Sequence, residues 1–342
     1  MWFKEKPVVS TRFGITILSV KGKLSAMCWL VVALFPHTSA AQWLQDTQSI
    51  MGTSIHVEVW SESPESGKQA IEAVMHEMQR INQLMSPYIK SSELSQLNAL
   101  ADKQPVNVSA ELYDLISLSV ELAKETNGAF DITFASVGYL YDYRKNHKPA
   151  QTTINDLLSA VNYRHIVLHP DKSEISFSHP KVKIDLGGIA KGHAVDNAIE
   201  ILKHRGVKHG LVSAGGDTKL LGDRLGKPWM VGIRDPRQAD KQAVVLPLSD
   251  TALSTSGDYE RYFEQDGQRY HHILSPKTGE SAYEVQSVSI IGPRSTLTDA
   301  LSTAIFVMGV QKGMNLLNRT PGYDGIIVDN ARKLHYSNAL AQ

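Results

Sequence analysis

Apolar positions beyond residue 42 follow two different periods along the chain. Over residues 49–60, isoleucine and valine alternate with polar residues, which predicts a strand with one buried face, entered through Gly52. Over residues 65–84, apolar residues recur at helical spacing, which predicts an amphipathic helix. This helix should end before Pro87, because a proline disfavours helical backbone in the residue before it.

The same two periods predict further elements in an irregular order. Helices are expected over residues 91–98, from residue 110 to a stop at residues 127–128, and over residues 153–161 and 295–306. Strands are expected over residues 166–168, 175–177, 182–184, 210–218, 229–233, 243–246, 252–259, 270–274, 288–292, 325–328 and 334–337. Because strands and helices mix without strict alternation and no repeat is visible, the pattern predicts an α+β fold in one compact domain.

A glycine-rich stretch over residues 183–196 lies at the centre of this pattern. A predicted strand ends at Ile184, and a helical pattern resumes at Ala194, with Gly187 and Gly188 between them. A strand that turns through glycines into a helix presents free backbone N–H groups, which bind anions such as phosphate. The alternative is that the glycines only permit tight packing.

Two charged residues strengthen the anion-binding interpretation of this stretch. Lys191 would add a positive charge, and Asp185 would add a hydrogen-bond acceptor or a magnesium contact through water. The spacing of the glycines matches neither the P-loop nor the dinucleotide fingerprint.

The overall charge and the cysteine content exclude several classes of protein. Lys plus Arg and Asp plus Glu both number 35, so no basic surface argues for nucleic-acid binding. Cys28 is the single cysteine, so an internal disulfide and a cysteine-ligated metal site are impossible.

The N-terminal residues 1–41 are predicted to be a signal peptide. Lys21 and Lys23 precede a short apolar run over residues 26–35, and small residues follow at 38–41. The run is too short for a stable transmembrane helix. Lipidation of Cys28 is the less favoured alternative, because apolar residues follow this cysteine. The exported domain would span residues 42–342, with Met1 open to question as the true start.

The predicted helix over residues 295–306 carries a candidate metal site. Asp299 and Thr303 are four residues apart and share one face of this helix. Oxygen ligands of this kind suit magnesium. The alternative is structural, with the carboxylate serving the helix N-terminus and the hydroxyl bonding back to the preceding turn. The neighbouring His271 and His272 are not expected to share a transition metal, because successive strand residues point to opposite faces.

Eight stretches, taken in order, resemble the FAD:protein FMN transferases of the ApbE family. They cover the chain from about Ile50 to its C-terminus, and any one of them alone is weak. The matching stretches are residues 51–53, 85–98, 128–133, 185–196, 215–217, 255–259, 272–279, and Asp299 with Thr303.

The resemblance implies an α+β enzyme that binds FAD with Mg²⁺. Such an enzyme attaches FMN through a phosphoester to a threonine or serine of an acceptor protein and releases AMP. The implied acceptor is an exported subunit of a membrane redox complex with a Ser/Thr-Gly-Ala-Ser/Thr motif. The implied location is the periplasm, with possible peripheral association with the inner membrane and no nucleic-acid partner.

The resemblance also assigns roles to individual residues. His272 would transfer a proton near the phosphates, and Asp299 would be catalytic through the metal. The implied magnesium ligands are Gly188 through its carbonyl, Asp299, Ser302 and Thr303. The implied FAD contacts are Met51, Tyr88, Ala129, Phe130, Asp131, Asp185, Lys191 and Ile273.

The chain departs from the family pattern at two positions near these residues. Ser275 stands where the family often has an acid, and His193 stands where an aromatic residue is usual. Two alternative functions stay open. One is hydrolysis of FAD to FMN and AMP, which the same site would serve. The other is flavin binding without turnover by a periplasmic accessory protein, which could dispense with the Asp299 and Thr303 pair.

Overall fold

A computed structural model of the chain describes residues 41–341. The predicted signal peptide, including Cys28, lies outside these residues apart from Ala41, so it stays a prediction. Within the described range, no helix is long and apolar enough to cross a membrane.

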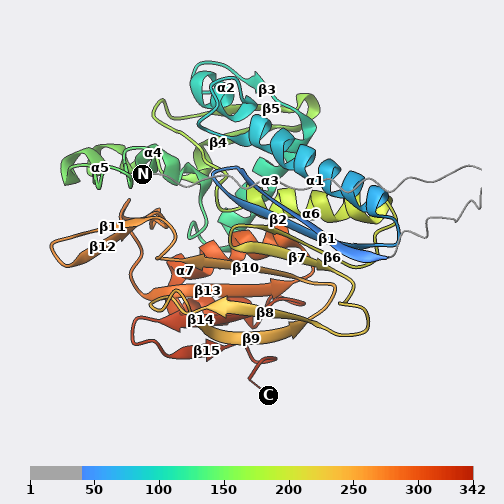
Figure 1. The fold of residues 1–342 in the computed structure, drawn as a ribbon. Helices are drawn as coiled ribbons and strands as arrows, with labels where there is room; N and C mark the ends of the chain where they lie inside the picture. Colours follow the sequence, from blue (N-terminus) through green and yellow to red (C-terminus); the bar gives the residue numbers. More distant parts are fainter. Residues whose placement is uncertain (1–40, 342) are drawn as a thin grey trace, which may run out of the picture. The chain divides into compact units, whose positions relative to one another are not determined.

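An eight-stranded antiparallel sheet runs through the described residues (Figure 1). The order in space brings the first strands of the chain beside strands from its middle, so distant segments meet on one sheet. The antiparallel sheet with separate helices is an α+β fold, as predicted. In spatial order the strands are β1 (Gln42–Ile50), β2 (Thr53–Ser61), β6 (Gly210–Ala214), β7 (Asp217–Leu221), β10 (Ala252–Gly257), β13 (Val285–Gly292), β14 (Asp324–Asp329) and β15 (Leu334–Tyr336).

Three smaller sheets accompany the large one. The hairpin predicted over residues 166–177 is present as two of these strands, and a short third strand pairs with it. The strands of the smaller sheets are β3 (Val106–Asn107), β5 (Glu174–Phe177) and β4 (Ile166–His169), then β8 (Trp229–Arg234) with β9 (Gln242–Leu248), and β11 (Tyr262–Gln265) with β12 (Gln268–His271).

The predicted helices are present. Most differ from the prediction by a few residues at their ends, but the helix predicted over residues 295–306 continues to Leu317. Ser63, Ser92 and Ser109 begin three of them by accepting a hydrogen bond from a backbone N–H in the first turn. The helices are α1 (Pro64–Met85), α2 (Glu93–Leu100), α3 (Ala110–Glu125), α4 (Ala135–Gly138), α5 (Gln151–Leu158), α6 (Ala190–His204) and α7 (Ser295–Leu317), with short 3₁₀ turns η1 (Ile132–Phe134), η2 (Tyr163–His165) and η3 (Pro170–Lys172).

The single strand predicted over residues 49–60 is wrong, because the structure has a hairpin there. β1 and β2 pair in antiparallel register and are joined by Met51 and Gly52. Both turn residues have positive φ, 55° and 71°, which a tight two-residue hairpin turn requires. β1 escaped prediction because it lies at the edge of the sheet and is mostly exposed, so it lacks an apolar alternation.

The strand predicted over residues 182–184 is also absent. This segment is extended, but a side chain takes the place of a neighbouring strand. The Asn98 amide donates to the Ile184 carbonyl at 2.8 Å and accepts from the Ile184 N–H at 2.8 Å. The Asp185 N–H donates to the Ile132 carbonyl at 3.0 Å. The segment is therefore fixed without belonging to a sheet.

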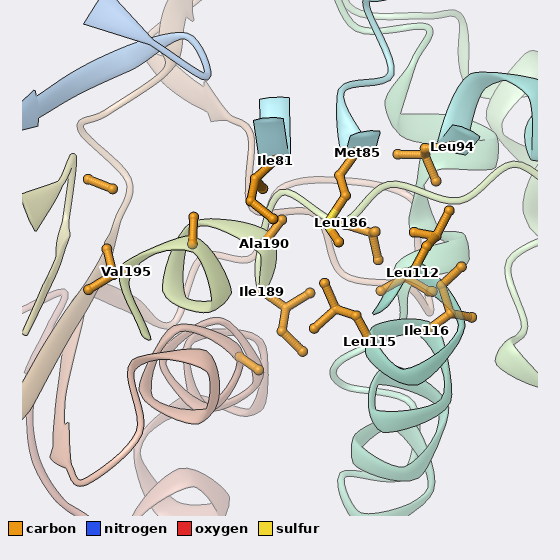
Figure 2. Close-up of a cluster of buried hydrophobic side chains, with 14 of the residues drawn as sticks. Ile81, Met85, Leu94, Leu112, Leu115, Ile116, Leu186, Ile189, Ala190 and Val195 are labelled. Carbon is orange, nitrogen blue, oxygen red and sulfur yellow. The ribbon is translucent and has the colours of Figure 1, made fainter. Parts of the chain in front are cut away.

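A hydrophobic core anchors the loop that leads into α6. Leu186 and Ile189 lie among Met85 of α1 and Leu112 and Leu115 of α3 (Figure 2). All five side chains are at most 3% exposed. Burial of these side chains on either side of Gly187 holds the glycine-rich loop in place, since each contributes on the order of 1.5–3 kcal/mol.

Helices α6 and α7 cap each other's N-termini. Neither helix has a side-chain cap at its own N-cap residue. Instead, Asp196 of α6 accepts hydrogen bonds from the N–H groups of Ser295 and Thr296 at 3.0 and 2.9 Å, and also pairs with Lys219 at 2.6 Å. Asp299 of α7 in turn accepts from the first turn of α6. Each carboxylate thus satisfies backbone donors that the partner helix leaves unpaired.

The substitution Asp196→Asn should lower the free energy of unfolding by about 1–3 kcal/mol, because it weakens a helix cap and leaves Lys219 unpaired. Burial raises the pKa of Asp196, but Lys219 and Thr296 outweigh it and lower that pKa overall. The stabilisation is therefore present above the ordinary value of 3.8 and is lost as the pH falls through the lower folded value.

Urea denaturation at neutral pH and below pH 4 checks this expectation. The control is Glu200→Gln on the same helix, whose carboxylate pairs with Lys203 at the surface. That variant should change the free energy of unfolding by less than about 0.5 kcal/mol. An Asp196→Asn variant as stable as the parent at neutral pH would refute the capping role.

Candidate active site

The two helices meet at Gly192, where a side chain has no room. A Cβ atom at this position would lie 2.2 Å from the Ser295 carbonyl oxygen and 2.8 Å from the Asp299 Cβ. The Gly192 N–H donates to Asp299 Oδ2 at 3.1 Å. The alternative that this glycine permits tight packing is therefore correct for Gly192, and the packing also orients a carboxylate.

Lys191 lies between two buried carboxylates. Its Nζ is 2.5 Å from Asp217 Oδ2 and 3.4 Å from Asp299 Oδ2. Burial opposes the charge of Lys191, but both aspartates outweigh it and raise its pKa. Burial, reinforced by the charge of Asp217, raises the pKa of Asp299 to about 7. The cluster carries two acids and one cation, so with both acids ionised it has an excess of negative charge that suits a metal ion.

The predicted metal ligands lie close together, but the hydroxyls of Ser302 and Thr303 have different neighbours. A Cβ at Gly188 would lie 3.2 Å from Thr303 Oγ1, so the loop backbone lies against that hydroxyl. The Ser302 hydroxyl donates to the Asp299 carbonyl at 2.8 Å and also lies 2.8 Å from the hydroxyl of Ser256. Ser256 is in addition 3.2 Å from Thr303 Oγ1. Ser302 is thus held by protein partners, whereas Thr303 faces the glycine loop.

The donor set fits magnesium in its chemistry. Carboxylate, hydroxyl and carbonyl oxygens are hard ligands, and Mg²⁺ commonly takes one or two carboxylates and completes its shell with water and substrate phosphates. Residues 41–341 contain no group of three or more His, Cys, Asp or Glu side chains placed to hold a metal. A magnesium site here would therefore use few carboxylates.

Asp185 and Asp131 occupy different environments. Asp185 Oδ1 accepts from the Gly187 N–H at 2.6 Å, and burial raises its pKa. Both oxygens of Asp131 are used by the protein: Oδ1 accepts from the Thr133 N–H at 2.9 Å, and Oδ2 accepts from the Tyr163 N–H at 2.8 Å. Asp131 therefore shapes the loop before η1, and its predicted contact with FAD stays a prediction.

The other predicted flavin contacts are spread over several elements. Phe130 is buried, and its ring lies 3.5 Å from the Cβ position of Gly188. Ile273 is buried, Met51 lies in the β1–β2 turn, and Tyr88 is 80% exposed, so its ring is free to stack on a ligand. Phe130 thus adjoins the glycine loop and Ala129 precedes it in the chain, whereas no contact of Tyr88 with that loop is established.

The two consecutive histidines have different surroundings. His271 Nε2 is 2.7 Å from the Ala282 carbonyl, and burial lowers its pKa to about 4. Among the described residues, His272 Nδ1 is buried without a hydrogen-bond partner. Burial, followed by the positive charge of Arg261, lowers the pKa of His272 to about 3. His272 is therefore neutral near pH 7 and able to accept a proton.

Several residues of this region have no role that the sequence predicts. Asp217 and Ser256 belong to stretches that resemble the family, and in the structure they contact Lys191 and the α7 hydroxyls. An acid after paired glycines was the available signal for Asp217. No signal in the sequence marked Arg261. The atypical His193 lies 2.8 Å from Glu111 of α3, so that side chain faces away from Lys191 toward another helix.

Known structures share this fold. The crystal structure of the ApbE protein from Thermotoga maritima has a TM-score of 0.81 at 34% identity and covers 88% of this chain and 98% of that chain. The flavin transferase ApbE from Vibrio cholerae has a TM-score of 0.78 at 27% identity and covers 88% and 99%. The fold is therefore that of the ApbE proteins, in agreement with the prediction.

Comparison of the sequence with known proteins identifies the family. The ApbE family profile matches residues 51–327. The protein named FAD:protein FMN transferase of Treponema pallidum (strain Nichols) is 34% identical over 310 residues, which cover 85% of this chain and 86% of that protein. The protein of the same name from Haemophilus influenzae is 31% identical over 285 residues, covering 79% and 82%. The chain belongs to the ApbE family, and the prediction of a transferase is confirmed.

The substitution Gly192→Ala should destabilise the protein by about 1–3 kcal/mol, because the new methyl group would collide with helix backbone. At an unconstrained helical site the same change would stabilise by about 1 kcal/mol, so the sign of the effect is informative. Gly188→Ala is the comparison, because its nearest neighbour is the movable Thr303 side chain and the loss should be smaller. Thermal denaturation of both variants is the measurement, and a stabilised Gly192→Ala protein would contradict the contact.

Proposed function

We propose that this protein is a Mg²⁺-dependent FAD:protein FMN transferase. The observation that carries the proposal is the cluster in which Lys191, the Asp299 carboxylate and the Thr303 hydroxyl lie beside a glycine loop. Splitting a pyrophosphate requires neutralisation of charge on the phosphates, and a metal, a lysine and backbone N–H groups supply it. The names of the curated relatives support the same activity.

The reaction moves one phosphoryl-linked group between two oxygens. The hydroxyl oxygen of an acceptor threonine or serine forms a bond to the phosphorus of the FMN half of FAD. The bond from that phosphorus to the bridging oxygen breaks, and AMP leaves with this oxygen. The hydroxyl proton passes to a base, and the product is FMN held in a phosphoester on the acceptor protein.

Asp299 and Thr303 would hold the magnesium ion, with the Gly188 carbonyl beside them. The ion would supply positive charge to the pyrophosphate. Because Lys191 is already offset by Asp217 and Asp299, the ion is needed to make the cluster attractive to an anionic substrate. Ser302 would support the site through its hydrogen bond to the Asp299 carbonyl.

His272 is the candidate base. It is neutral at pH 7, but a base with a pKa of about 3 is weak. Part of the lowering comes from the charges of Arg261 and Lys191. A bound pyrophosphate would offset these charges and raise the pKa of His272, which would strengthen the base when the substrate is present.

The flavin would contact Met51, Tyr88, Ala129, Phe130, Asp131, Asp185, Lys191 and Ile273, as the family resemblance implies. The acceptor would be an exported subunit of a membrane redox complex with a Ser/Thr-Gly-Ala-Ser/Thr motif. The signal-like residues 1–41 support a periplasmic location, where association with the inner membrane would bring the enzyme to its acceptor.

The deciding experiment incubates the purified protein with FAD, Mg²⁺ and a domain bearing the acceptor motif, followed by intact mass measurement. A mass gain equal to bound FMN, lost when the metal is chelated, supports the proposal. Free FMN and AMP without labelling would indicate a hydrolase. Bound, unreacted FAD would indicate a flavin-binding accessory protein.

The substitution Asp299→Ala should abolish transfer while some flavin binding remains, because it removes the only carboxylate of the proposed magnesium site. Isothermal titration with Mg²⁺ and FAD, beside the labelling assay, checks both parts. Glu200→Gln, on the exposed face of α6, is the control and should label the acceptor at the parent rate. Transfer by Asp299→Ala at the parent rate would show the metal assignment to be wrong.

The substitution His272→Ala should slow transfer by about two to four decades, the usual contribution of general acid–base catalysis. The exposed His204→Ala at the end of α6 is the control and should be unaffected. Single-turnover labelling at saturating FAD is the measurement. An unchanged rate for His272→Ala would remove this residue from the reaction.

A further inference from the structure

Arg261 lies between two parts of the candidate active site. Its carbonyl accepts a hydrogen bond from the His272 N–H at 3.1 Å, which joins the start of the β11–β12 hairpin to the candidate base. Its Nη2 atom is 3.5 Å from the Cβ position of Gly52 in the β1–β2 turn. The guanidinium therefore lies over the turn that holds Met51, a predicted flavin contact.

The donors of Arg261 are free for a ligand. Within residues 41–341, its guanidinium makes no hydrogen bond and no ion pair, and the residue is exposed. Neighbouring arginines differ. Arg237 binds Asp258 through two contacts of 2.7 and 2.6 Å, and Arg269 lies 3.4 Å from the same carboxylate. Arg234 lies over the Tyr259 ring at 4.9 Å.

An unpaired arginine is important here because the site has little other free positive charge for an anionic substrate. Lys191 is paired with Asp217 and Asp299, so most of its positive charge is offset before a metal ion and a substrate bind. The pyrophosphate of a dinucleotide carries two negative charges. Arg261 and Lys191 both act electrostatically on Asp185 and on His272, so the phosphate-binding region lies within reach of both cations.

We propose that Arg261 binds the pyrophosphate of the dinucleotide substrate directly and thereby selects dinucleotides over uncharged flavins. The proposal rests on the proposed function for its substrate class. A guanidinium matches phosphate oxygens with two parallel N–H donors, which a lysine cannot reproduce. Arg261 would hold the substrate from the β11 side, while the α6 and α7 residues hold the metal.

The test compares ligand affinities of the full chain and its variants in the presence of Mg²⁺. For Arg261→Gln, the Kd for FAD and for ADP should rise about tenfold to a hundredfold, as expected for loss of a charge-assisted hydrogen bond. The Kd for riboflavin, which has no phosphate, should not change. Arg261→Lys should restore part of the affinity. The matched control is Arg234→Gln, because Arg234 is an arginine of strand β8 whose guanidinium stacks on Tyr259.

Three outcomes would overturn the proposal, and a fourth would separate it from the proposed function. Equal affinities of Arg261→Gln and the parent for FAD and ADP would show that Arg261 does not bind phosphate. An equal loss for riboflavin would mean that the substitution disturbs the flavin site. A raised KM for the acceptor with unchanged FAD affinity would place Arg261 at the protein acceptor. Failure of the parent to label an acceptor while it binds FAD would refute the proposed function and leave the phosphate contact to be judged by these affinities.

Discussion

The reciprocal capping of α6 and α7 is the constraint on which the active site depends. Each helix lacks a cap of its own and takes a carboxylate from the other, Asp196 in one direction and Asp299 in the other. The exchange works only if the helices touch, and Gly192 permits this contact. One arrangement therefore satisfies helix termini and places the carboxylate that the proposed metal requires. Stability and the proposed function would then be coupled at the same atoms.

The same contact determines the electrostatics of the site. Asp217 and Asp299 are buried beside Lys191, and buried charges are tolerated only when they are paired and hydrogen-bonded. Two acids lie beside one base, and burial together with the charge of Asp217 raises the pKa of Asp299. A divalent cation would remove this imbalance and return Asp299 to its charged form. A buried carboxylate with a strongly raised pKa is typical of a functional site.

The local pattern of apolar and polar residues predicts much of the fold. It fails at segments whose structure depends on contacts with residues distant in the sequence. The helix over residues 65–84 is confirmed because its apolar stripe faces the core. The edge strand β1 was missed because an exposed strand needs no alternation. Residues 182–184 were misassigned because an extended apolar segment resembles a strand even when the Asn98 side chain pairs with it. Periodicity reports burial, and it does not identify the partner that satisfies the backbone.

The candidate active site, like the fold, contains some residues that the local sequence pattern predicts and others whose role depends on distant partners. The placement of Asp299 and Thr303 on one face of α7 could be predicted, because they are four residues apart in a helix. The role of Arg261 could not be predicted, because the proposal rests on its guanidinium having no partner among the described residues. A sequence does not show which charges are already paired. The neutral state of His272 likewise follows from burial and from two cations on other elements. A substrate that brings negative charge between these cations changes the proton affinity of the base, so binding and base strength are linked through charge alone.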